Sequence, residues 1–159
     1  MTDDSLLRTL AAHEETLVFR RFTVETALEL GAFLLAEATR RRLPVALAVR
    51  KGGQRVFHAA LPGTSVDNDE WLDRKARVVD RYGQSSYRVG ESFRVNGTTF
   101  EAKSRLDPAL YAAHGGVFPV IVTGVGPVGT VGVSGLPQAD DHAFVVEVVE
   151  DFLRHGYDS

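Results

Sequence analysis

Residues 44–61, PVALAVRKGGQRVFHAAL, decide the fold. Within this stretch, 45–50 and 55–61 are runs of small, β-branched and aromatic residues, and the pair Gly52-Gly53 stands between them. Glycine supplies the positive φ angles that tight hairpin turns require, so a glycine pair between two such runs predicts a β-hairpin. We therefore expect these two strands to pair antiparallel.

A second hairpin is expected further along the chain. Residues 117–123 and 128–133 are strand-like in composition, and the glycines and proline of 124–127 favour a turn between them. A fifth strand is expected at 17–22, LVFRRF, which combines apolar and aromatic residues.

Helical spacing of apolar residues predicts helices at 4–13, 23–42, 67–82 and 140–154. Thr23 suits the N-cap of the second helix, and Pro44 ends it. A short helix is expected from Asp107 to His114, whereas 85–96 shows no sustained period and is expected to be irregular. Two hairpins among helices predict an α+β fold with a five-stranded, mainly antiparallel sheet, rather than a doubly wound one.

Composition narrows the class of protein. The 159 residues fit one domain spanning 1–159, and 18 basic against 21 acidic residues disfavour a general nucleic-acid binder. Cysteine is absent, which excludes disulfides and thiolate metal sites. The first residues carry acids where a secretory signal needs bases, and apolar runs fall short of the roughly 20 residues of a membrane-spanning helix. A cytoplasmic protein without membrane or nucleic-acid partners is expected.

The sharply recognisable catalytic motifs are missing. The sequence has no Gly-x-Ser-x-Gly, His-Glu-x-x-His, EF-hand loop or dinucleotide fingerprint. An enzyme of one of those classes is therefore disfavoured, and the candidate sites must be found residue by residue.

The first candidate site lies in residues 113–120, AHGGVFPV, where His114, Gly115 and Gly116 precede an apolar strand. A glycine is favoured at the end of a helix because it adopts positive φ without a Cβ clash. A second glycine lets backbone N–H groups approach an anion or a flat ligand. His114 beside them can act as a donor, a base or a metal ligand.

The second candidate group opens the 67–82 helix. Asp67 and Glu70 have capping-box spacing, with Asp67 as the expected N-cap. Trp71 and Lys75 share a face with apolar residues of the following turns, so Trp71 is a core or pocket residue and Lys75 is partly buried. A buried lysine needs a partner, for which a ligand carboxylate or Glu101 is the candidate.

For two further histidines, His58 and His142, a structural role is weighed against a role in a binding or metal site. His58 is expected to be a hydrogen-bonded histidine at a sheet margin, with a pocket role as the alternative. Asp140-Asp141-His142 comes nearest to a metal-binding run, but adjacent residues of a helix do not point to one position. No metal site is predicted.

Three blocks together resemble a known family: residues 67–75, residues 114–120, and residues 129–137 leading to Asp141-His142. Their order and spacing are similar to those of the haem-degrading or haem-binding domain family, also called GlcG/HbpS-like, and in particular its branch of small proteins of unestablished function. The resemblance covers the chain from the second helix to the last. It implies a profilin-like α/β/α layered fold and assembly into homo-oligomers.

The resemblance leaves three classes of function open. A haem ligand would need an axial residue and ring contacts, for which the candidates are His114, His58, Tyr111, Lys75, Phe118, Trp71 and Tyr82. A small anionic metabolite would instead bind the Gly115-Gly116 backbone and Lys75, with His114 as acid or base if the protein is an enzyme. The third class is a homo-oligomeric interaction module without catalysis. The predicted ligand-binding residues are His114, Gly115, Gly116, Lys75, Phe118, Trp71 and His58.

Overall fold

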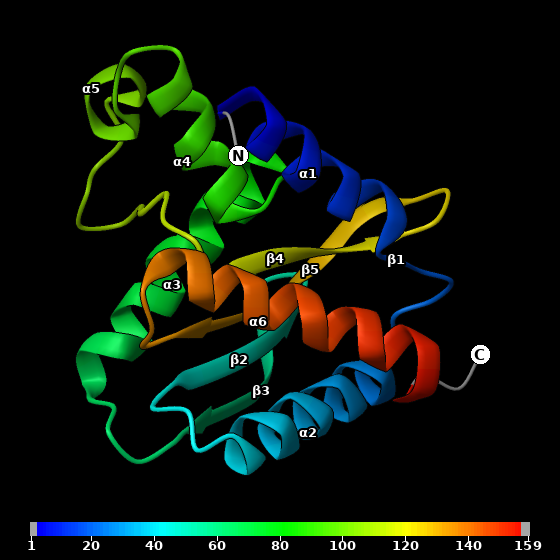
Figure 1. The fold of residues 1–159 in the computed structure, drawn as a ribbon. Coiled ribbons are helices and arrows are strands. Elements are labelled where there is room, and N and C mark those ends of the chain that lie inside the picture. Colours follow the sequence, from blue (N-terminus) through cyan, green and yellow to red (C-terminus); the bar gives the residue numbers. More distant parts are fainter. Residues whose placement is uncertain (1–2, 157–159) are drawn as a thin grey trace.

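A five-stranded sheet forms the centre of the molecule, with helices on both of its faces (Figure 1). The computed structural model describes residues 3–156. The strands run in the order β1-β4-β5-β2-β3, where the bounds are Val18–Phe19 for β1, Ala46–Lys51 for β2, Gln54–Ala60 for β3, Val117–Val122 for β4 and Gly126–Ser134 for β5. Both predicted hairpins are present, and β5 also pairs antiparallel with β2. β1 pairs parallel with β4, so the sheet is mainly antiparallel and the α+β prediction is confirmed.

Two helices cover one face of the sheet. α2 (Val24–Arg40) and α6 (Gln138–Asp151), which ends in a short π-helical turn, η1 (Phe152–Gly156), pack on the large apolar residues of the strands. β2 illustrates the alternation: Leu47 and Val49 lie in this larger core, while Ala46 and Ala48 lie on the opposite face. Thr23 caps α2 as predicted, through reciprocal hydrogen bonds with Thr26.

A third helix, α3 (Val66–Tyr82), crosses the other face over β5, β4 and β2. Its Leu72, Ala76 and Val79 pack on Ala46, Ala48 and Val117 of the strands. The alanines of β2 allow this helix to approach the sheet closely, so residues on its inner side lie near the strand ends. This placement brings Lys75 into the interior.

Three further helices complete the fold. α1 (Asp3–Thr16) packs on α4 (Ser86–Val95), and α4 is followed by α5 (Phe100–Ser104). Glu14 of α1 accepts hydrogen bonds from the Ser85 backbone N–H and from Arg88, at 3.1 and 2.7 Å, and so holds α1 to the start of α4. Within residues 3–156, no helix combines the length and apolar composition needed to cross a membrane.

Several predicted boundaries are wrong. The sequence predicts an irregular segment at 85–96, but 86–95 form α4, because Ser85 caps the helix and Val89 is buried against Val78 and Phe100. The expected helix from Asp107 to His114 is a turn: the Asp107 carboxylate accepts from the Ala109 N–H, and no regular helix follows.

Two further elements differ in detail. The N-cap of α3 is Ser65 rather than Asp67, and the Ser65 N–H donates to Asn68. The first strand spans Val18–Phe19 instead of 17–22, since β4 pairs with it over those two residues.

Candidate functional site

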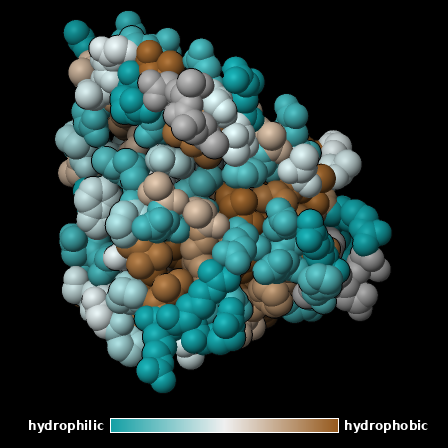
Figure 2. All heavy atoms as spheres, viewed as in Figure 1, coloured by the Kyte–Doolittle hydropathy of each residue, from teal (hydrophilic) through white to brown (hydrophobic). Residues whose placement is uncertain are grey.

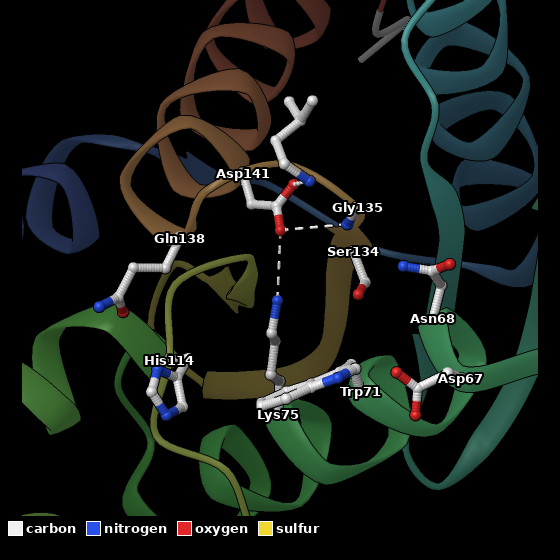
Figure 3. Close-up of a pocket in the computed structure, with 10 residues that line it drawn as sticks. Asp67, Asn68, Trp71, Lys75, His114, Ser134, Gly135, Gln138 and Asp141 are labelled. Atoms are coloured by element: carbon white, nitrogen blue, oxygen red, sulfur yellow. Dashed lines mark hydrogen bonds and ion pairs between the residues drawn. The ribbon is translucent and has the colours of Figure 1, made fainter. Parts of the chain in front are cut away.

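A pocket of about 250 Å³ lies where the start of α3, the end of β5 and the start of α6 meet the segment that precedes β4 (Figure 3). We call it the Lys75 pocket. Its lining residues are Asp67, Asn68, Trp71, Lys75, His114, Ser134, Gly135, Leu136, Gln138 and Asp141. Three of the residues predicted from the sequence, Trp71, Lys75 and His114, therefore line one pocket.

Lys75 forms a buried ion pair in this pocket. Its side chain extends from α3 to the first turn of α6, where Nζ lies 3.3 Å from Oδ2 of Asp141 (Figure 3). Lys75 is 4% exposed and Asp141 is 1% exposed. The partner is thus Asp141 and not Glu101, which lies exposed on α5.

Asp141 also orders the turn between β5 and α6. Its two carboxylate oxygens accept hydrogen bonds from the backbone N–H groups of Gly135 and Leu136, at 3.4 and 3.0 Å. One carboxylate therefore connects a helix start, a strand end and α3. The sequence does not predict this pairing, because Lys75 and Asp141 are 66 positions apart; the pattern around Asp141 indicates a helix start and a weak metal-binding run.

Burial shifts both members of the pair toward their neutral forms. Desolvation lowers the pKa of Lys75, and the nearby Asp141 carboxylate partly offsets that effect. Desolvation likewise raises the pKa of Asp141, against the opposing effects of Lys75 and the two backbone N–H groups. An ammonium group has three protons to donate, and Asp141 is the acceptor found for it within residues 3–156. The remaining protons are available to an oxygen of a ligand.

Gly115 and Gly116 are required by close packing rather than by the end of a helix. A Cβ on Gly116 would lie 2.7 Å from Lys75 Nζ and 2.5 Å from the Val133 carbonyl oxygen, and its φ of +140° also favours glycine. A Cβ on Gly115 would lie 2.3 Å from the Gln138 carbonyl oxygen. The helix-end interpretation of this pair is therefore wrong.

One of the two backbone N–H groups predicted to bind an anion already has an acceptor within the chain. The Gly115 N–H already donates to Oε1 of Gln138, at 3.0 Å. Gly116 instead gives Lys75 room to reach Asp141, and Gly115 allows the close approach of Gln138, so the effect of both glycines on the pocket is indirect.

Two aromatic rings form part of the pocket wall, and an arginine stacks on one of them. The Trp71 and His114 rings meet edge to face, with centroids 5.5 Å apart, and the Arg74 guanidinium lies 4.1 Å from the centroid of the Trp71 ring. Trp71 and His114 line the pocket and are half-buried, whereas Arg74 is not among the lining residues. A ligand in the pocket would contact these two rings.

The other predicted site residues lie elsewhere. Phe118 is 1% exposed and belongs to the core on the opposite face of the sheet. His58 of β3 lies 2.7 Å from Asp69 of α3, at the outer edge of the sheet, which agrees with a hydrogen-bonded margin histidine. Tyr82 packs on Phe93 and Phe100.

The Asp140-Asp141-His142 run does not form a metal site. Asp141 faces the Lys75 pocket, whereas His142 lines a separate cavity beneath α1. In the part of the chain that the structure describes, no group of three His, Asp or Glu residues is arranged to hold a metal ion.

Residues 22–150 match the family described as haem degrading protein HbpS-like. The chain belongs to the HbpS-like family. The family resemblance predicted from the three sequence blocks is therefore confirmed, and the match runs from the residue before the cap of α2 nearly to the end of α6.

Two relatives match the chain over almost its full length. A UPF0303 protein of Streptomyces avermitilis is 57% identical over 150 residues, which cover 94% of this chain and 92% of the relative. A UPF0303 protein of Streptomyces coelicolor is 58% identical over 144 residues, 91% of each chain.

Solved structures show the same fold. The Ybr137w protein matches with a TM-score of 0.87 at 28% identity, and the match covers 95% of this chain and 90% of the Ybr137w chain. HbpS has a TM-score of 0.65 at 20% identity, with 86% of this chain and 92% of HbpS covered. The PduOC:Heme complex has a TM-score of 0.68 at 15% identity, with 81% and 93% covered. At these identities, the last two neighbours show the fold alone.

Proposed function

We propose that this protein binds a small metabolite bearing an acidic oxygen in the Lys75 pocket. The observation that carries the proposal is a lysine that is 4% exposed at a pocket wall, with one of its three protons donated to Asp141. Buried donors require acceptors, and an ammonium donates most strongly to a carboxylate or phosphate oxygen. A ligand oxygen would complete the hydrogen bonding of Lys75.

The shape and polarity of the pocket support a small, polar ligand. A volume of about 250 Å³ lies below the roughly 300–1,000 Å³ of sites for drug-sized molecules. Asp67 and Asn68 lie on the wall across from Gln138, so hydroxyl groups of a ligand have side-chain acceptors on both sides of the lysine. The Trp71 and His114 rings would cover its less polar side.

Haem is the second candidate ligand. The haem-degrading family that the chain matches and the PduOC:Heme complex among its structural neighbours support it. His114 is the residue of the Lys75 pocket suited to ligate iron, because Lys75 is paired with Asp141. The walls, however, carry Asp67, Asn68 and Gln138 and enclose a volume suited to a small molecule, so a porphyrin does not fit inside this pocket and would contact its rim.

The single tryptophan of the chain provides the assay. Trp71 lines the pocket, so its fluorescence should change when a ligand enters. We would titrate a panel of two- to four-carbon carboxylates and phosphate esters, and expect a saturable change with at least one of them. Lys75→Met should lose this response, while Lys103→Met, which removes an exposed lysine on α5, should keep it. An equal response in both variants would contradict the proposal.

A haem titration separates the two candidates. A saturable shift of the haem Soret band that is lost in His114→Ala, but kept in His58→Ala, would favour haem at the rim of the pocket. The weak, unsaturable absorbance of free haem with all three proteins would exclude it.

Assembly into homo-oligomers is proposed alongside ligand binding. Val24 and Leu28 lie one turn apart on α2 and are 44% and 45% exposed, so they form a small apolar strip on the outer side of the helix. A self-association surface would cover them. Sedimentation velocity of the wild type and of Val24→Glu would test this, and an unchanged monomer in both would exclude it.

A further inference from the structure

A second cavity lies between α1 and α6, on the other side of α6 from the Lys75 pocket. Its volume is about 450 Å³, and its walls include Leu6, Leu10, His13, Tyr87, His142 and Val146. Figure 2 shows apolar surface gathered between these two helices. We call it the His142 cavity.

The histidines of this cavity have unsatisfied nitrogens. His142 is 4% exposed, and neither its Nδ1 nor its Nε2 has a hydrogen-bond partner within residues 3–156. Nδ1 of His13 is likewise buried without a partner among those residues. The two imidazole centroids are 5.9 Å apart, and the Tyr87 ring lies 5.1 Å from that of His142. Buried polar atoms are nearly always hydrogen-bonded, so these nitrogens call for a partner other than the residues of 3–156, such as water or a ligand.

The protonation state of His142 defines that partner. Burial lowers the pKa of His142 to about 4, with a smaller contribution from His13, so the imidazole is neutral near pH 7. A neutral imidazole carries one N–H donor and one acceptor nitrogen. A hydroxyl group can donate to such an acceptor nitrogen or accept from such an N–H.

The other lining residues of the cavity indicate the charge and polarity of the ligand. Among the described residues, no lysine or arginine lines it, and its two acids, Glu147 and Glu150, pair with Arg41 and Arg154, so the walls offer no positive charge to an anion. The other walls are mostly aliphatic or aromatic. A metal ion is also disfavoured, because within 3–156 no third His, Asp or Glu completes a ligand set with the two histidines.

We propose that the His142 cavity is a second ligand site, which takes a small, uncharged aromatic molecule with a phenolic hydroxyl group. The hydroxyl bonds to a ring nitrogen of His142, and the apolar body lies between α1 and α6, beside Leu10 and Val146. The Tyr87 and His13 rings favour an aromatic over an aliphatic body, because edge-to-face contacts with them are available. The site does not depend on the Lys75 pocket.

The test compares three probes of similar size: phenol, toluene and benzoate. Each is titrated into the full chain at pH 7.5, and binding is followed by the ¹⁵N resonances of the imidazole rings. Phenol should bind saturably and about 10-fold more tightly than toluene, which corresponds to one hydrogen bond. Benzoate should not saturate. Equal binding of phenol and toluene, or no binding of phenol, would overturn the proposal and leave a cavity filled by water.

Variants locate the hydroxyl contact. His142→Leu should retain toluene binding and reduce phenol binding to the same level, while His155→Leu, at an exposed histidine of η1, should leave both unchanged. A phenol preference that survives in His142→Leu would overturn the assignment.

Two wild-type measurements keep the test decisive if His142→Leu fails to fold. Phenol must shift a ring ¹⁵N resonance of His142, and the absence of such a shift refutes the hydroxyl contact. Zn²⁺ added alone should not saturate these resonances, and a saturable Zn²⁺ response that blocks phenol would show a metal site instead.

Discussion

Replacing Asp141 with alanine removes the acceptor for Lys75 and so tests whether this buried pair holds α6 against α3. Loss of one partner from a buried ion pair costs about 3–5 kcal/mol, because the other charge stays buried without compensation. The Gly135 and Leu136 N–H groups also lose their acceptor, but both residues are partly exposed, so water can replace it at little cost. We expect a loss of about 4 kcal/mol in the free energy of unfolding.

The free energy of unfolding is measured by urea denaturation, followed by circular dichroism and by Trp71 fluorescence. In thermal unfolding, a loss of about 4 kcal/mol lowers Tm by roughly 8–16 °C for a chain of this length. Asp141→Asn should cost less than Asp141→Ala, because the amide oxygen still accepts from the Lys75 ammonium.

A double-mutant cycle separates the pair from the general effect of each change. Lys75→Met, Asp141→Leu and the double variant should show a coupling energy of about 2 kcal/mol or more, with the double variant more stable than either single one. Additive costs would refute the reasoning, since they would mean that the two side chains contribute independently.

Three further outcomes follow from contacts described above. Burial lowers the pKa of His142 to about 4 in the folded state, against about 6.5 when unfolded, so the unfolded state binds the proton first. The free energy of unfolding should therefore fall by about 3 kcal/mol as pH decreases from about 6.5 to about 4. Urea titrations at several pH values should show a flatter dependence in His142→Leu. Gly116→Ala should cost more than Gly97→Ala, by about 2 kcal/mol in the same assay, because both glycines have positive φ but only Gly116 has atoms within 3 Å of an added Cβ. Glu14→Gln should cost about 1–2 kcal/mol and speed amide hydrogen exchange in α1, and unchanged exchange would contradict its role in holding that helix.

The sheet was predictable from the sequence because its signals are local. Gly52-Gly53 lies within the first hairpin turn, and the glycines of 124–127 lie at the second. The face of α3 that carries Lys75 was also readable, since helical period alone places Lys75 with Val78 and Val79.

The missed elements depend on tertiary contacts. α4 has serines and Gly90 in a short helix, and its stability comes from packing of Val89 rather than from propensity. A Cβ on Gly90 would lie 2.1 Å from the Ala113 carbonyl oxygen, which explains a glycine within a helix. Such contacts between distant segments leave no periodic signal.

The candidate site was predictable only in part for the same reason. Trp71, Lys75 and His114 were identified from their local surroundings, and the structure brings them to one pocket. Asp141 was not recognised as the partner of Lys75, because periodicity gives no distances between α3 and α6. The sequence singles out Gly115 and Gly116, but glycine is required there because Gln138 and Lys75 approach them closely. No local sequence pattern predicts these two contacts.

The strand order has a consequence for synthesis of the chain. β5 occupies the middle of the sheet, and Ala46 of β2 pairs with Ser134 of β5. On the ribosome, the β2–β3 hairpin therefore emerges long before the strand that covers its inner edge, and Leu47 and Val49 await both β5 and α6. Core formation must follow translation of most of the chain, so nascent chains that end before β5 expose an unpaired strand edge to chaperones and to one another.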